Sequence, residues 1–134
     1  MLKITRKVEY ALIALSQMQM KGDDSLTSVK EISRQNDIPY ELLAKTMQLL
    51  ARAEIVEAVK GPHGGYQIIK DPTDITMPTF FEIIEGPIGF MDCYFDSNCD
   101  QIHTCSIRTP IQRINDSIRD MFNNISLNDI TRSV

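Results

Sequence analysis

Residues 28–70 read SVKEISRQNDIPYELLAKTMQLLARAEIVEAVKGPHGGYQIIK, and this stretch decides the fold. Its opening, Ser28-Val29-Lys30-Glu31, has the spacing of a capping box and predicts a short helix that runs to about Gln35. Pro39 suits the first turn of a second helix, where a missing N–H costs nothing, and this helix is expected to end near Ala53. Two helices joined by such a short turn are typical of a helix-turn-helix.

A β-hairpin is expected directly after the second helix. Residues 55–60 and 66–70 have the composition of strands, and Gly61-Pro62-His63-Gly64-Gly65 between them has the composition of a turn. The loop glycines allow the hairpin tip to approach another backbone closely. A first helix, expected at residues 5–20, precedes these elements. Together they predict a winged helix-turn-helix DNA-binding domain at residues 1–75.

A winged helix binds DNA through its second helix and its hairpin. The N-terminal residues of a recognition helix reach base edges in the major groove, and here these are Tyr40, Glu41, Ala44 and Lys45. Candidates for contacts of the wing with phosphates or the minor groove are Lys60 and His63. Candidates for contacts with backbone phosphates are Arg6, Lys7 and Lys30. The alternatives are a winged helix that contacts protein and basic side chains that are only solvated.

Charge and composition narrow the function classes. Residues 1–70 hold ten Lys and Arg against eight Asp and Glu, whereas residues 71–134 hold four against ten, and this asymmetry favours a nucleic-acid ligand. There is no apolar run of about 18 residues and no apolar segment behind the N-terminus, so we expect no membrane span and a cytoplasmic location. Without a Gly-rich phosphate loop or a nucleophile–base pair, an enzyme is not expected.

Three cysteines, Cys93, Cys99 and Cys105, lie in one polar loop at residues 90–105 with the spacing C-x5-C-x5-C. In a reducing cytosol, clustered thiols are more often metal ligands or redox groups than disulfides. Zinc sites favour closer pairs, whereas iron–sulfur clusters take thiolates, so the spacing favours an iron–sulfur cluster. The fourth ligand is left open between His103, a carboxylate and water. A regulator that uses zinc or thiol redox chemistry without iron is the alternative.

Residues 76–134 are expected to form a second unit that holds a short helix, the cysteine loop, a dimerisation helix at 106–125 and a C-terminal tail. Apolar residues in the long helix step alternately by four and three, which is the pattern of a heptad seam: Ile107, Ile111, Ile114, Ile118, Met121 (or Phe122) and Ile125. Such a seam packs against a second helix, which favours a homodimer over packing on its own domain. The whole chain is therefore expected to be mostly α with a small β-hairpin.

Four segments match a known family: LKITRKVEYAL at 2–12, VKGPHGGY at 59–66, the three cysteines, and FNNISL at 122–127. On these residues, over nearly its whole length, the chain resembles the IscR/NsrR-type family of winged-helix, iron–sulfur-dependent transcription regulators. The resemblance implies a homodimer on a palindromic double-stranded DNA operator, with one recognition helix in each half-site. It also implies that a 4Fe–4S or 2Fe–2S cluster tunes DNA affinity in response to nitric oxide, redox state or iron and cluster status.

The chain departs from the IscR pattern at the fourth ligand and at the DNA. IscR-like members place a histidine three residues after the last cysteine, and here that residue is Arg108. NsrR-like members use an acidic residue of the first helix, contributed by the partner subunit, and the matching residue is Glu9. Ala44 replaces a base-reading acidic residue, and Lys60 stands where an arginine is usual. Operator preference should therefore not be copied from IscR.

Overall fold

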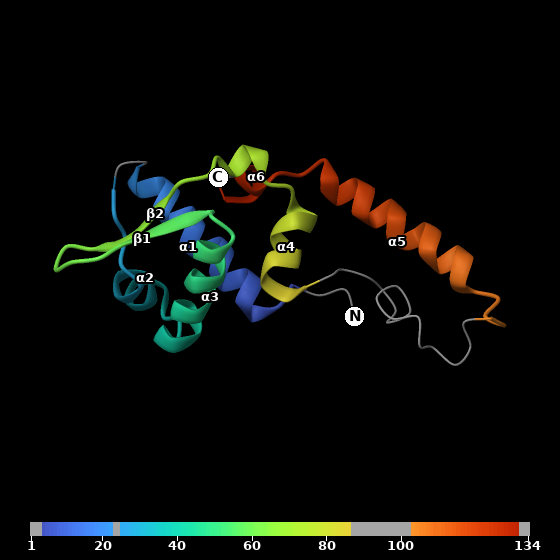
Figure 1. Cartoon of the computed structure of the whole chain (residues 1–134), viewed down its shortest axis with the longest axis horizontal. Helices are drawn as coiled ribbons and strands as arrows, with labels where there is room; N and C mark the ends of the chain where they lie inside the picture. The colour runs from blue at the N-terminus through green and yellow to red at the C-terminus, as the bar shows by residue number, and fades with distance from the viewer. Residues whose placement is uncertain (1–3, 23–24, 87–102, 132–134) are drawn as a thin grey trace.

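The computed structural model describes residues 4–22, 25–86 and 103–131, and it confirms a mostly helical chain with one antiparallel hairpin (Figure 1). Its elements in chain order are α1 (Arg6–Lys21), α2 (Val29–Asn36), α3 (Tyr40–Arg52), β1 (Val56–Val59), β2 (Gly65–Ile68), the 3-10 turn η1 (Pro72–Asp74), α4 (Met77–Glu85), α5 (Arg108–Asn123) and α6 (Leu127–Thr131). No helix of the described chain is long and apolar enough to cross a membrane.

Side-chain caps fix the starts of the first two helices. The Thr5 hydroxyl accepts a hydrogen bond from the Val8 amide at 3.3 Å, and the Ser28 hydroxyl accepts one from the Glu31 amide at 3.1 Å. Both bonds satisfy amides that lack a partner within the helix, and each such cap contributes about 1 kcal/mol. The Glu31 carboxylate bonds the Lys21 ammonium at 2.9 Å, which joins the start of α2 to the end of α1.

The turn between α2 and α3 depends on a left-handed residue. Asp37 has φ 54° and ends α2, and its short polar side chain tolerates this conformation better than most residues do. Pro39 follows as the N-cap of α3, one residue earlier than its expected place inside the first turn, because its extended backbone (φ −55°, ψ 125°) leads into the helix without belonging to it. The two helices therefore form the expected helix-turn-helix.

The hairpin is joined to the segment before α2. Strands β1 and β2 pair from Val56 with Ile68 to Val59 with Gly65. The Thr27 amide donates to the Tyr66 carbonyl at 3.0 Å, and the Tyr66 amide donates back to Thr27 at 2.8 Å. Strand β2 therefore pairs with Thr27 as well as with β1. The sequence around Thr27 has no strand-like pattern that would indicate this pairing.

Replacing Gly65 with alanine is expected to lower the free energy of unfolding by about 1–3 kcal/mol, because this glycine lets the two backbones meet. An added Cβ would lie 2.7 Å from the carbonyl carbon and oxygen of Thr27, so the backbone must move. Urea unfolding followed by circular dichroism measures the loss. The Glu57→Ala variant, on the exposed side of β1, is the control and should differ by less than about 0.5 kcal/mol. Wild-type stability in Gly65→Ala would show that the contact is easily relieved.

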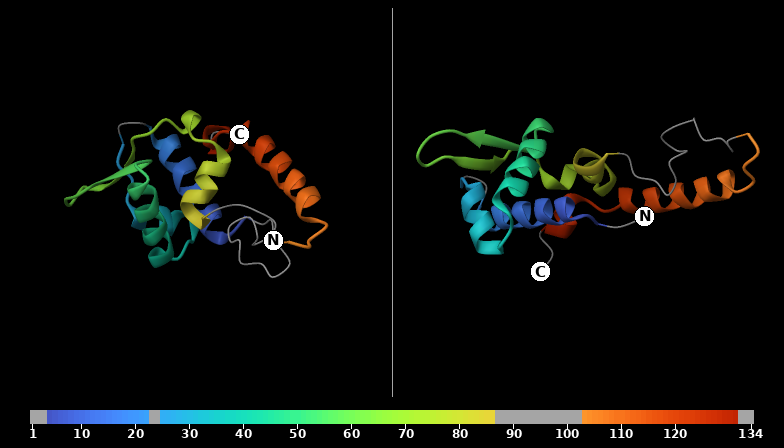
Figure 2. Two further views of the ribbon diagram at one scale, coloured as in Figure 1. Left: turned by 45° about the vertical axis from the view of Figure 1, so that its right-hand side comes forward. Right: turned by 90° about the horizontal axis from the view of Figure 1, so that it is seen from below.

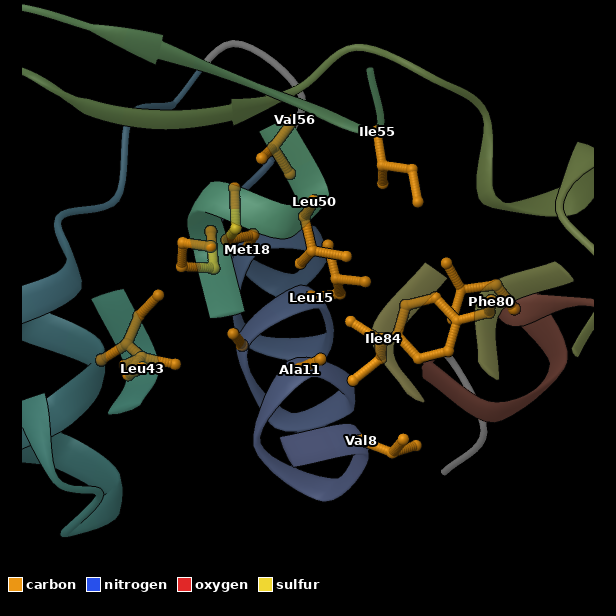
Figure 3. Close-up of a cluster of buried hydrophobic side chains, with 14 of the residues drawn as sticks. Val8, Ala11, Leu15, Met18, Leu43, Leu50, Ile55, Val56, Phe80 and Ile84 are labelled. Atoms are coloured by element: carbon orange, nitrogen blue, oxygen red, sulfur yellow. The ribbon is translucent and has the colours of Figure 1, made fainter. Parts of the chain in front are cut away.

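The core is organised around α1 (Figure 3). One face of this helix is fully buried, through Val8, Ala11, Ala14, Leu15 and Met18. In Figure 3, Leu43 of α3 lies on one side of this helix, Phe80 and Ile84 of α4 lie on the other, and Leu50 of α3 lies beside Leu15. The recognition helix and α4 therefore pack on the same central helix.

The core crosses the domain boundary expected after residue 75. Ile75, Met77, Phe80 and Leu127 all belong to the one buried cluster that contains the winged-helix core. The Met77 amide bonds the Ile125 carbonyl at 3.0 Å, and the Leu127 amide bonds the Ile75 carbonyl at 2.7 Å. The segment expected to be a C-terminal tail is thus the helix α6, which packs against α1 and η1. Ile125, Leu127 and Ile130 are two and three residues apart, and so short and irregular a pattern does not indicate this return.

Helix α5 leads away from this core, with its first turn at the outer end of the molecule (Figures 1 and 2). Near its other end, Phe122 packs edge to face on Phe81 of α4, with ring centroids 5.9 Å apart. The heptad seam is divided between two environments. Ile111, Ile118, Phe122 and Ile125 are half-buried, whereas the outer stripe remains 50–55% exposed: Ile107, Ile114 and Met121. The helix itself is Arg108–Asn123, so Ile107 precedes it and Ile125 follows it.

Candidate functional site

Helix α3 presents a polar face to solvent. Its opposite face buries Leu43, Met47 and Leu50 in the core, which fixes the rotation of the helix. That rotation leaves Tyr40, Glu41 and Lys45 exposed, as expected for residues that reach base edges. Ala44 is half-buried and packs against the core, so only its methyl group is available for an apolar contact such as the thymine methyl.

Two further exposed residues of α3 were missed by sequence reasoning. Gln48 and Arg52 follow Glu41 and Lys45 along the same side of the helix, at seven and eleven residues after Glu41. The helical spacing i, i+4, i+7, i+11 could have found them once the buried face was assigned. A glutamine is suited to adenine and an arginine to guanine or phosphate. The polar face of α3 (Glu41, Lys45, Gln48 and Arg52) therefore continues beyond Lys45, where the expected residues end.

The wing projects from the body of the molecule in each view (Figures 1 and 2). Lys60 and His63 lie in its loop and are exposed. The loop turns tightly because the Gly64 amide bonds the Gly61 carbonyl at 3.0 Å, and a Cβ on Gly64 would lie 2.1 Å from the Val59 carbonyl oxygen. The glycines thus hold a compact tip that presents two basic side chains.

The remaining basic candidates are exposed on the first turns of two helices. Arg6 and Lys7 begin α1, and Lys30 lies at the start of α2. The Arg6 guanidinium is within 3.1 Å of the Glu9 carboxylate, so its charge is partly neutralised within the chain. Lys7 and Lys30 are therefore better placed than Arg6 to meet a phosphate.

The structure describes only part of the expected metal site. Cys105 is a free, half-buried thiol just before α5, and His103 is exposed two residues earlier. Cys93 and Cys99 lie outside the described residues. Among the residues that are described, no three His, Cys, Asp or Glu side chains come together as a metal site.

Glu9 and Cys105 are not brought together within one chain. The Glu9 side chain is 44% exposed and bonds Arg6. It lies on the central helix α1, whereas Cys105 precedes the outer end of α5 (Figures 1 and 2). By donor type, thiolates suit an iron–sulfur cluster and a carboxylate suits a harder position on it, so these residues fit the group chemically.

Comparison with known proteins shows which family the chain belongs to. The Rrf2 model, described as an iron-dependent transcriptional regulator, matches residues 4–133. The chain is 30% identical over 126 residues to an HTH-type transcriptional regulator of Aquifex aeolicus, covering 92% of this chain and 87% of that one. It is 26% identical to IscR of Vibrio vulnificus, covering 96% and 77% of the two chains.

A solved structure shows the same fold. The structure of CymR, the global cysteine regulator of Bacillus subtilis, matches with a TM-score of 0.75 and 26% identity, covering 98% of this chain and 97% of that one. The relatives are transcriptional regulators and not enzymes, and the resemblance to IscR-type regulators is confirmed. The chain is a DNA-binding regulator that belongs to the Rrf2 family.

Proposed function

We propose that this regulator acts in the cytoplasm as a homodimer on a palindromic DNA operator, and that an iron–sulfur cluster sets its affinity for that operator. The cluster ligands would be Cys93, Cys99, Cys105 and Glu9 of the partner subunit. The observation that carries the proposal is the position of Cys105, a half-buried free thiol three residues before the helix that holds the heptad seam. The thiol donor and the surface for a second subunit are thus adjacent in the chain.

The homodimer is supported by the outer stripe of α5. Ile107, Ile114 and Met121 recur every seven residues, and each is at least half exposed. Large apolar side chains in a regular stripe are stabilised when a second helix covers them. A two-fold dimer would place two recognition helices in two half-sites, and so the operator would share its symmetry.

A carboxylate ligand on α1 would connect the cluster to the DNA-binding surface. Helix α1 packs directly against α3 through Ala11, Leu15 and the residues around them. A carboxylate is a harder and weaker ligand for iron than a thiolate. Such a cluster supplies a labile position that gives way to nitric oxide, oxygen or loss of iron. Release of Glu9 would then free α1, and with it α3, to shift against α5.

Operator binding by iron-loaded and metal-free protein tests the proposal. The protein is purified anaerobically, an operator is selected from random-sequence duplexes with each form, and Kd is measured for both at one salt concentration. Mössbauer spectra of the same samples report the cluster as 4Fe–4S or 2Fe–2S. We expect Kd to differ between the forms by roughly 5–150-fold, the range of typical coupling energies. Equal Kd values would leave the cluster without a regulatory role.

A regulator that works by thiol or zinc chemistry is the second candidate. The likeness to CymR, named a global cysteine regulator, favours it, and the free thiol of Cys105 would be its reactive group. A colourless protein that contains zinc, or that changes its operator affinity on thiol oxidation without iron, would support this candidate. A brown protein with iron and sulfide would support the cluster.

The Lys45→Ala variant is expected to bind the operator about tenfold more weakly, because Lys45 is exposed on the polar face of α3. If Lys45 contacts a phosphate, the salt dependence of binding also decreases, whereas a base contact relaxes the preference at one operator position. Fluorescence anisotropy at several salt concentrations measures both effects. The control is Arg113→Ala, which removes the same charge from the exposed side of α5. An equal loss in both variants would indicate a general charge effect and not a contact of α3.

A further inference from the structure

Helix α4 carries two carboxylates that bond two different helices. Glu82 pairs with the guanidinium of Arg119 on α5, with Nη2 and Oε1 2.5 Å apart. Glu85 accepts a hydrogen bond from the Thr5 hydroxyl at 2.6 Å. Residues three apart lie on one side of a helix, so a single face of α4 reaches both the start of α1 and the side of α5.

The Thr5 hydroxyl connects Glu85 to the backbone of α1. It accepts from the Val8 amide at 3.3 Å and donates its only proton to Glu85. The bond to Glu85 therefore orients the hydroxyl so that a lone pair is left for the cap. The first turn of α1 that this cap holds also carries Glu9.

These contacts flank the cysteine-bearing stretch in sequence. Glu85 is the last residue of α4 and precedes Cys93 by eight positions, whereas α5, which carries Arg119, begins three residues after Cys105. We propose that Glu85, supported by the Glu82–Arg119 pair, is a positioning residue that couples the metal state to the first turn of α1. This inference rests on the proposed function and adds the route within the chain by which the metal state reaches the DNA-binding surface.

The contacts are suited to a positional role because they contribute little to folding. Glu82 and Arg119 are each more than one-third exposed, and the Thr5–Glu85 bond is exposed as well. Exposed polar contacts of this kind add little to stability. The buried face of α4, with Phe80 and Ile84, holds the helix in place without them. Removing Glu85 should therefore leave the fold intact and release the start of α1.

The Glu85→Ala variant tests this role in the full-length dimer. The readout is the ratio of operator Kd between metal-free and iron-loaded protein, measured on the duplex selected with wild type. We expect this ratio to move toward one by roughly threefold to tenfold, within the range for residues that carry coupling, while iron per protomer and thermal midpoint remain those of wild type. In the metal-free variant, amide exchange in the first turn of α1 should be faster. Asp74→Ala, an exposed carboxylate on η1, is the charge-matched control.

Two substitutions of Thr5, one that keeps the hydroxyl and one that removes it, provide a second test. Thr5→Ser keeps a hydroxyl that can both cap and donate, and should keep the wild-type ratio, whereas Thr5→Val should move it toward one as Glu85→Ala does. An unchanged ratio in Glu85→Ala and Thr5→Val would overturn the positioning role. Loss of iron from Glu85→Ala would overturn it too, because Glu85 would then act at the metal site itself. A wild-type ratio of one would instead remove the proposed function.

Discussion

The Phe80→Ala variant is expected to lose about 3–5 kcal/mol of its free energy of unfolding, which is the cost of removing a large aromatic side chain from a closed core. Phe80 is completely buried and is the largest such side chain in the described chain. It lies where α4 packs on α1, with Ile84 of α4 beside it (Figure 3). Urea unfolding followed by circular dichroism measures the change.

The control for Phe80 is its neighbour in the sequence. Phe81 is half-buried and contacts Phe122 of α5. Phe81→Ala should cost about 0.5–1.5 kcal/mol for the aromatic pair beyond the area it buries, and its effect should be confined to the junction of α4 with α5. If the two variants were equally destabilised, α4 would not be an integral part of the winged-helix core. A separate second unit beginning near residue 76 would then be the better description.

The winged helix could be predicted because the interactions that start its helices and form its turns are local in sequence. Thr5 and Ser28 cap the helices that follow them, and Asp37 and the wing glycines provide the conformations that the turns need. Each of these effects acts within a few residues, so spacing alone indicates it. Strand ends are less well predicted: β1 begins after Ile55, whose amide bonds the end of α3 at the Leu50 carbonyl.

The parts that could not be predicted depend on contacts between distant segments. Thr27 with Tyr66, and Ile75 with Leu127, meet across 39 and 52 positions, and the spacing of nearby residues does not indicate which distant segment each of them meets. The heptad seam shows the opposite case. Its spacing is regular, yet Phe122 and Ile125 pack against the chain's own core while Ile107 remains exposed. Spacing identifies an apolar stripe but does not specify which partner covers each turn.

The Cys105→Ser variant is expected to lose at least about tenfold in iron content under limiting iron, because loss even of groups that only support a metal ligand costs 10–100-fold in affinity. Cys105 is half-buried and free, so a serine of nearly the same size should preserve α5 and the core. Iron and sulfide are assayed after anaerobic reconstitution, with the thermal midpoint measured alongside. Ser106→Ala, which changes an exposed neighbour that is not a candidate ligand, is the control. Full iron content in Cys105→Ser would remove Cys105 from the ligand set.

Mixed dimers extend this experiment to the fourth ligand. If Glu9 completes the site of the other subunit, each Glu9→Gln protomer keeps its three cysteines but cannot supply the carboxylate that its partner's site needs. Cys105→Ser protomers still offer that carboxylate. A dimer with one protomer of each kind would then regain one of its two sites, although each variant alone binds iron poorly. If Glu9 acted within its own chain, no mixture could rebuild a complete site. Recovery of iron on mixing therefore identifies a shared site, and no recovery contradicts it.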